Sequence, residues 1–338
     1  MGGLVETLSF LGGSVKNLLK FSAAAVVAMG AFVSVAVADV TLKVAYENNP
    51  GEPIDVVFKK WATDLDEQSG GTIKLELYPS SQLGSHQDVT EQALFGSNIV
   101  TISDVGFLAD FIPDLSILFG PYLSDDPDKL FSVYESDWFK EKEKELADKG
   151  IHVVMKNYLY GVRHLIANKP VNTPDDLKGM KIRTPNNDMQ IKAIAAMGGT
   201  PTPMPLGEAY TALTQGIVDG VENPLPVIDG AKFQEAAKYL SMIGYLTNTS
   251  LIIGGEAFFK TLDPKDVALI EKTAYDAGIY SQELAAKNDQ AILEKFKAQG
   301  VEVIYPDTAP FREKSKAVYT QFPEWSDGLY EKIQEQLK

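Results

Sequence analysis

The sequence has no cysteine and only three histidines among its 338 residues. Without cysteine, disulfide bonds, thiolate zinc sites and cysteine nucleophiles are excluded. His86, His152 and His164 stand far apart, without the spacing of metal ligands. We therefore expect neither a metal site nor a cofactor.

Sequence motifs of several enzyme classes are also missing. There is no G-x-S-x-G nucleophile elbow, no G-x-G-x-x-G after a strand and no P-loop. Carboxylates are abundant, so a pair suited to glycoside chemistry stays open, although nothing singles one out. These absences favour a protein without catalytic residues.

The charge balance excludes another class of partner. The formal net charge is -15, and an acidic surface repels the phosphates of nucleic acids. Hydrophobic residues make up 45% and aromatic residues 10% of the chain, which is typical of a folded globular protein. The length is sufficient for two domains.

The N-terminal segment is built like a targeting signal. Lys16 and Lys20 precede an apolar run over residues 21–37, and the sequence A-V-A ends at Ala38, before Asp39. A positive flank, an apolar centre and an A-x-A site predict a secretory signal peptide over residues 1–38, and hence a periplasmic protein. A transmembrane anchor is the alternative, but the small residues at the end of the run favour cleavage.

The chain after Asp39 has an α/β pattern. Alternating apolar residues predict strands over 40–46, 72–78 and 99–104. Amphipathic helices are predicted between them, over 53–68 and around 86–95. Strand, helix and strand in this order imply a right-handed crossover and a parallel pair.

Two further strands are predicted over 151–158 and 162–168, around Tyr160-Gly161. We place the first crossing between two lobes at this dipeptide. The prediction assigns residues 39–160 and 249–288 to lobe I, and residues 161–248 and 289–338 to lobe II.

A long helix is predicted near the C-terminus. Asp263 and Pro264 form a strong helix start, and the only breaker before Gly300 is Gly278. At about 1.5 Å per residue such a helix is roughly 50 Å long. It should therefore bridge both lobes.

Arg183 is the leading candidate for a binding residue. It lies in the strand-like stretch K-I-R-T-P at residues 181–185. A guanidinium offers a planar fork that matches both oxygens of a carboxylate. The sequence alone also allows a structural ion pair at this position.

Four stretches, in order and with matching gaps, carry a family resemblance. They are Y-P-S-S-Q-L-G at 78–84, L-K-G-M-K-I-R-T-P at 177–185, P-T-P-M-P at 201–205 with Glu208 and Tyr210 behind it, and V-D-G-V-E-N-P at 218–224. This pattern resembles the solute-binding proteins of tripartite ATP-independent periplasmic (TRAP) transporters, the DctP-like family. The resemblance implies a two-lobed α/β periplasmic binding protein, with a cleft between the lobes and a long helix bridging both.

The resemblance also implies roles for individual residues. Arg183 matches the arginine that holds the carboxylate of an organic acid, and Arg163 matches a second arginine on the same group. Asn223 matches an asparagine that hydrogen-bonds that group, although without the family it reads equally as a turn residue before Pro224.

Four further positions depart from the family pattern or vary within it. Glu47 stands where several members have asparagine, Asp104 where they have an acidic residue, and His86 where others carry an acidic contact. Leu206 replaces an aromatic residue that packs on the ligand. If Glu47 and Asp104 face the cleft, ionised carboxylates there disfavour a second ligand carboxylate and suit hydroxyl donors.

A hydroxylated monocarboxylate, such as a uronate or related sugar acid, is therefore the predicted ligand. A C4-dicarboxylate is the alternative and would need a further cation, for which Lys43, Arg163 and His164 are candidates. The resemblance implies delivery to the small and large membrane subunits of a sodium-coupled transporter, and a monomer is expected. A sensor that presents the ligand to a receptor kinase would have the same sequence features.

Overall fold

The computed structural model describes residues 40–338, apart from the side chains of residues 286–288. The predicted signal peptide over residues 1–38 lies outside the described residues. In the described part of the chain, no helix is both long enough and apolar enough to cross a membrane.

Within residues 40–338, nine strands form one mixed sheet in the order β2-β1-β3-β8-β4-β7-β5-β6, with β9 beside β8. The strands are β1 (Val40–Ala45), β2 (Ile73–Tyr78), β3 (Ile99–Asp104), β4 (Ile151–Ala167), β5 (Lys181–Thr184), β6 (Thr200–Pro203), β7 (Gly220–Pro224), β8 (Tyr239–Gly255) and β9 (Glu302–Ile304).

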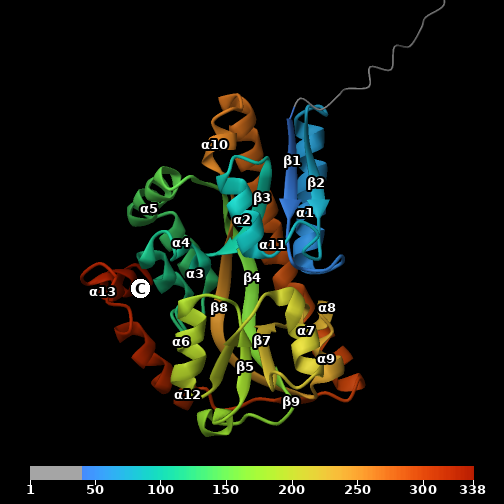
Figure 1. Ribbon diagram of the computed structural model, residues 1–338, viewed down its shortest axis with the longest axis vertical. Helices are drawn as coiled ribbons and strands as arrows, with labels where there is room; N and C mark the ends of the chain where they lie inside the picture. Colours follow the sequence, from blue (N-terminus) through green and yellow to red (C-terminus); the bar gives the residue numbers. More distant parts are fainter. Residues whose placement is uncertain (1–39) are drawn as a thin grey trace, which may run out of the picture. The chain divides into compact units, whose positions relative to one another are not determined.

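Helices cover both faces of this sheet (Figure 1). They are α1 (Pro53–Gln68), α2 (His86–Leu94), α3 (Val105–Leu108), α4 (Pro127–Tyr134), α5 (Asp137–Asp148), α6 (Asp188–Met197), α7 (Leu206–Thr214), α8 (Leu225–Gly230), α9 (Phe233–Ala236), α10 (Glu256–Phe259), α11 (Pro264–Ala298), α12 (Ala309–Ser315) and α13 (Leu329–Gln336), with the 3-10 helices η1 (Pro113–Phe119), η2 (Pro174–Leu177) and η3 (Lys316–Thr320).

Strands β4 and β8 are the axis of the fold. Each has 17 residues, and they pair antiparallel from Ile151 opposite Gly255 to Ala167 opposite Tyr239. The prediction of two separate strands around Tyr160-Gly161 is therefore wrong. Gly161 has a φ of 128°, which is readily adopted only by glycine, and the register shifts on both sides of it. The strand bends there instead of ending.

Two groups of parallel strands flank this axis at its two ends. β1 pairs in parallel with β2, as the sequence predicted, and also with β3, while β5 pairs in parallel with β6 and β7. The carboxyl ends of β1 and β3 carry Glu47 and Asp104, while β5 carries Arg183. Ligands of open α/β sheets bind at such carboxyl ends.

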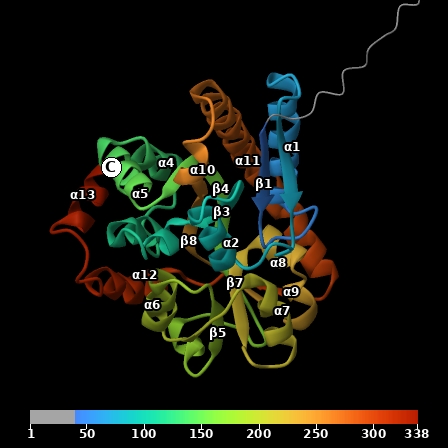
Figure 2. The same ribbon diagram turned by 45° about the horizontal axis from the view of Figure 1, so that its top comes forward.

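The long helix α11 joins the two groups, as predicted. Ile270, Ala274 and Ala277 belong to a core cluster with α1 and β1. Leu293 and Phe296, further along the same helix, belong to a separate cluster with α7 and β7. Figure 2 shows α11 running past α1 towards α8 and α9. The predicted lobe boundaries stay a prediction, because β4 and β8 cross without a linker.

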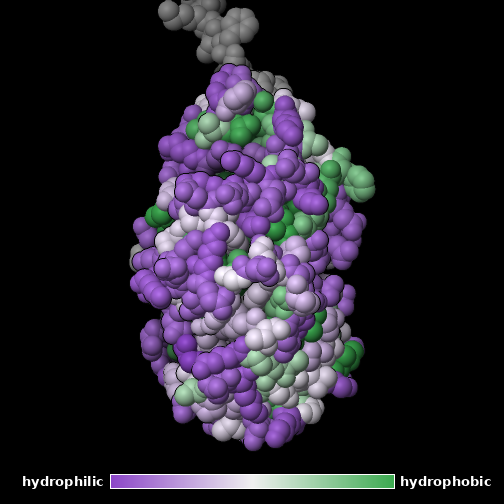
Figure 3. Space-filling view, turned by 90° about the vertical axis from the view of Figure 1, so that its left-hand side faces the viewer, coloured by the Kyte–Doolittle hydropathy of each residue, from purple (hydrophilic) through white to green (hydrophobic). Residues whose placement is uncertain are grey.

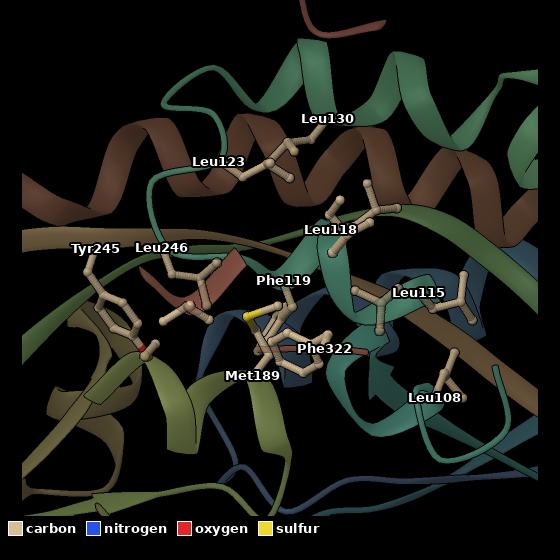
Figure 4. Packing of buried hydrophobic residues seen from close by; sticks show 14 of the residues in the cluster. Leu108, Leu115, Leu118, Phe119, Leu123, Leu130, Met189, Tyr245, Leu246 and Phe322 are labelled. Atoms are coloured by element: carbon tan, nitrogen blue, oxygen red, sulfur yellow. The ribbon is translucent and has the colours of Figure 1, made fainter. Parts of the chain in front are cut away.

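A third core cluster connects segments that are far apart in the sequence. Leu118 and Phe119 of η1 lie near Met189 of α6, Leu246 of β8 and Phe322 of the C-terminal segment (Figure 4). The C-terminal segment also places α13 against α4. This packing fixes η1 and α3, which follow β3 directly at the candidate site.

Candidate functional site

A cavity of about 530 Å³ lies between the two groups of strands. All seven predicted ligand-binding residues line it: Arg183, Arg163, Asn223, Glu47, Asp104, His86 and Leu206. A smaller chamber of about 60 Å³ adjoins it and shares Glu47, His86, Asp104 and Leu206. Residues separated by up to 176 positions, from Glu47 to Asn223 (223 − 47), thus converge on one place.

Arg183 is buried with only part of its hydrogen-bonding capacity used. Its side chain is 3% exposed, and its Nε and Nη2 both donate to the carbonyl oxygen of Met204, at 3.0 and 2.7 Å. None of the hydrogen bonds found in the described residues involves its Nη1. Burial lowers the pKa of Arg183, against the opposing charges of Glu222 and Glu47. The guanidinium remains charged and can accept a further anion.

Arg163 is buried too, but it already has a counter-ion. Its Nε donates to Glu222 Oε2 at 2.6 Å and its Nη2 to Glu222 Oε1 at 2.9 Å, while its Nη1 donates to Asn248 Oδ1 at 2.7 Å. Burial acts against its charge, but the carboxylate of Glu222 raises the pKa of Arg163 above the usual value. The ion pair with Arg163 gives Glu222, the glutamate of the E-N-P motif, a structural role. The sequence around Arg163 or Glu222 alone does not suggest this role.

Two buried polar atoms on cavity residues lack a partner within residues 40–338. They are Nδ2 of Asn223 and Oε1 of Glu47. Asn223 is only 2% exposed, and an unpaired buried amide costs free energy unless a ligand or water pairs with it. Together they offer a donor and an acceptor to a guest molecule.

Asp104 is held by β8. Its Oδ1 accepts hydrogen bonds from Asn248 Nδ2 at 2.9 Å and Ser250 Oγ at 2.5 Å. Burial raises the pKa of Asp104, while the charge of Arg163 opposes the rise. Because Asn248 also accepts from Arg163, Asp104 and Arg163 are linked through one side chain.

His86 and Leu206 each begin a helix at the cavity wall. The Nε2 atom of His86 lies 3.0 Å from Ser103 Oγ, and the His86 ring stacks on Phe107 with 4.1 Å between the ring centroids. Burial lowers the pKa of His86 to about 4, so the imidazole is neutral at pH 7. Leu206 contributes an apolar contact at the start of α7.

Sequence reasoning missed three aromatic residues of the cavity, which are Phe107, Phe111 and Tyr160. Phe107 and Tyr160 are each three residues from a predicted site residue, Phe107 after Asp104 and Tyr160 before Arg163. That spacing is too common to have identified either of them.

Two of the three residues named as candidates for a further cation are not at the cavity. Lys43 and His164 are absent from the residues that line it in the described chain. Burial lowers the pKa of His164 to about 4, and its Nδ1 accepts the backbone N–H of Gly244. Among residues 40–338, no group of three or more His, Asp and Glu side chains is arranged to hold a metal ion.

A two-lobed α/β scaffold with a buried, half-satisfied arginine in an inter-lobe cavity is the architecture of an extracytoplasmic solute-binding protein. The sequence matches the profile of the bacterial extracellular solute-binding protein family 7 over residues 44–324. It is 33% identical over 282 residues to the sialic acid-binding periplasmic protein SiaP of Vibrio cholerae, covering 83% of this chain and 88% of that protein.

Two solved structures are also similar. A TRAP periplasmic solute-binding protein from Ochrobacterium anthropi with bound L-fuconate has 62% identity and a TM-score of 0.88, covering 89% of this chain and all of the other. One from Actinobacillus succinogenes with bound L-galactonate has 42% identity and a TM-score of 0.86, covering 88% and 99%. The chain belongs to this family and is a TRAP periplasmic solute-binding protein.

Proposed function

We propose that the protein captures an open-chain, six-carbon sugar acid in its cavity and delivers it to the membrane subunits of a TRAP transporter. The observation that carries the proposal is Arg183, a buried cation whose Nη1 has no protein partner in the described residues, together with the unpaired Nδ2 of Asn223 in the same cavity. The two donors suit one carboxylate. Arg163, next to them, contributes positive charge that Glu222 partly neutralises.

The opposite wall suits hydroxyl groups. Glu47 and Asp104 offer carboxylate oxygens, and the neutral His86 has one ring nitrogen beyond its contact with Ser103. The relatives with 62% and 42% identity hold L-fuconate and L-galactonate, which are open-chain hydroxylated monocarboxylates. An aldonate of this kind would place its carboxylate at Arg183 and its hydroxyl groups along the acidic wall.

The charge of the cavity disfavours the C4-dicarboxylate alternative. A second ligand carboxylate would face Glu47 and Asp104 and would need a third cation. The cationic residues lining the cavity in the described chain are Arg163 and Arg183, and Arg163 is already paired with Glu222. Monocarboxylates therefore fit better.

In this proposal the protein acts as a monomer and binds its ligand by hinge closure. It then releases the ligand to a sodium-coupled pair of small and large membrane subunits. The signal peptide over residues 1–38 would export the protein to the periplasm, the compartment of its family. The protein would return its acid unchanged, because its role is transport and not turnover.

A thermal-shift screen tests the proposal. The protein from Asp39 onwards is melted with aldonates, uronates, C4-dicarboxylates, keto acids and amino acids. A ligand at about 100 times its Kd adds roughly 2.7 kcal/mol, which raises the Tm by a few degrees. Shifts with L-fuconate or L-galactonate support the proposal. A shift with succinate or malate alone contradicts the assignment of the ligand, and no shift with any acid contradicts the role of Arg183.

A further inference from the structure

Glu47 lies where the two groups of strands meet around the cavity. It follows β1, and the backbone N–H groups of His86 and Leu206, the first residues of α2 and α7, favour its ionised form. The charge of Arg183 acts on it from β5. Its Oε1 is buried without a partner in the described residues. In the absence of a ligand, the charge of Glu47 thus acts on Arg183 together with that of Glu222.

The charged groups at the cavity have a negative sum when all are ionised, and a bound acid makes this sum more negative. Arg163 and Arg183 supply two positive charges, whereas Glu47, Asp104 and Glu222 supply three negative charges when ionised, so the sum is +2 − 3 = −1. A bound carboxylate changes this sum to −2. Burying uncompensated charge is costly, and a buried carboxyl group responds by binding a proton.

We propose that the cavity takes up one proton from solvent together with its acid, and that Glu47 holds this proton. The inference rests on the proposed function, because it requires an anionic ligand. The balance is simple: the ligand carboxylate, the Glu47 carboxylate and one solvent proton give a complex with an ionised ligand and a neutral Glu47. Competition for Arg183 causes this proton uptake, because the ligand carboxylate pairs with the cation that had stabilised ionised Glu47.

Glu47 is a better proton acceptor than Asp104. Asp104 keeps two donors on Oδ1, from Asn248 and Ser250, and the charge of Arg163 nearby, whether or not a ligand is bound. Glu47 has an unpaired Oε1 and loses its main cation to the ligand. Burial already raises the pKa of Glu47 before any ligand enters, and the charge of Asp104 adds to that rise.

The other titratable groups around Glu47 and Asp104 do not account for the proton uptake. These groups are Arg163, Arg183, Glu222, His86, Tyr160, Tyr134, Glu91 and Asp110. The imidazole and the two phenols are neutral near pH 7, because burial lowers the pKa of His86 to about 4 and raises those of Tyr134 and Tyr160. Glu91 and Asp110 are solvent-exposed at the rim, where water screens their charge.

A protonated Glu47 also changes what the site recognises. The carboxylic acid is both a donor and an acceptor, whereas a carboxylate only accepts. It can thus donate to a ligand hydroxyl or carboxylate oxygen and accept from another hydroxyl. A protonated Glu47 would in this way favour hydroxylated acids without repelling their carboxylate.

Titration calorimetry in two buffers tests the inference. L-fuconate and L-galactonate are titrated at pH 7.5 in phosphate and in Tris, whose ionisation enthalpies differ, so the difference in heat gives the protons taken up. We expect an uptake approaching one proton for the wild type. Between the pKa of Glu47 in the free protein and its pKa in the complex, the Kd should rise about tenfold per pH unit.

Two variants locate the proton. Glu47→Gln keeps the shape but cannot titrate, so its binding should proceed without proton uptake and with a Kd independent of pH. Glu91→Gln removes an exposed carboxylate from the rim of the same cavity and should keep the uptake of the wild type. Binding without uptake by the wild type, or uptake that persists in Glu47→Gln, overturns the inference while leaving the proposed function intact. No heat with any acid overturns both.

Discussion

Arg183 holds a charge that its protein neighbours satisfy only in part, so its replacement should affect binding more than folding. Arg183→Ala should weaken L-fuconate binding by about 3–5 kcal/mol, because the buried carboxylate loses its cation. Arg183→Lys should also bind poorly, since a point charge does not reproduce the fork. Calorimetry measures both.

Lys181 provides the matched control for this prediction. It lies two residues earlier on the same strand and is solvent-exposed. Lys181→Ala should therefore bind like the wild type. Near-wild-type affinity of Arg183→Ala would remove Arg183 from the site.

His152 gives the fold a pH-dependent contact far along β4 from the site. Its Nδ1 lies 2.8 Å from Glu256 and its Nε2 2.9 Å from Glu271 of α11, and the ring stacks on Phe259. Burial lowers the pKa of His152. The hydrogen bonds with Glu271 and Glu256 and the charges of these two residues outweigh burial, so the pKa is raised overall.

A raised folded-state pKa fixes the sign of the pH dependence. The stability from this contact is fully present below the unfolded pKa of about 6.5 and is lost as pH rises through the higher folded pKa. In urea unfolding, the free energy of unfolding of the wild type should exceed that of His152→Gln most at pH 6, and this difference should shrink towards pH 9. A difference that grows with pH would contradict this assignment of charge.

At the scale of elements, helix α11 is docked on β4 at a glycine. Gly278 lies mid-helix, and a Cβ added there would come within 2.0 Å of Asn157 Oδ1. Asn157 is buried and its Nδ2 donates to the carbonyl oxygen of Tyr275, so it cannot simply move aside. The glycine permits the close approach of helix and strand.

Gly278→Ala should consequently destabilise the protein, although alanine normally favours a helix by about 1 kcal/mol over glycine. Overpacking costs about 1–3 kcal/mol, so we expect a net loss of unfolding free energy in urea. In an Asn157→Ala background the obstruction is gone, and the same substitution should become stabilising. Equal effects in both backgrounds would show that Asn157 does not limit the approach.

The elements also show how far the sequence could predict the structure. The local patterns of β1, α1, β3 and α11 gave correct types and nearly correct bounds. Those of β1 and α1 follow from burial of one face, and that of α11 from its start at Asp263 and its lack of breakers. The continuity of β4 was missed, since Gly161 has the signature of a turn and only the pairing with β8 shows a bend.

The candidate site was predictable only through the family motifs. The family resemblance named seven of the residues that line the cavity. They did not reveal that Glu222 and Asn248 occupy most donors of Arg163, because those contacts join β4, β7 and β8 in space. Long-range pairing of this kind leaves no periodic signal in one sequence.

For the whole molecule, the net charge of -15 opposes the capture of an anion. The face seen in Figure 3 is mostly hydrophilic, with hydrophobic residues scattered over it. At the cavity, Glu91 and Asp110 add acidic groups to the rim, outside the buried arginines. An approaching acid therefore meets repulsion before it reaches Arg183.

This arrangement predicts that added salt speeds association. Raising ionic strength from 0.01 to 0.15 M shortens the screening length from about 30 to about 8 Å, which weakens long-range repulsion more than buried contacts. In stopped-flow measurements with L-fuconate, kon should rise a few-fold while koff changes little. The double variant Glu91→Gln/Asp110→Asn should start from a higher kon at low salt and depend less on salt. A kon that falls with salt would mean instead that the arginines attract the acid from a distance despite the negative charge of the whole molecule.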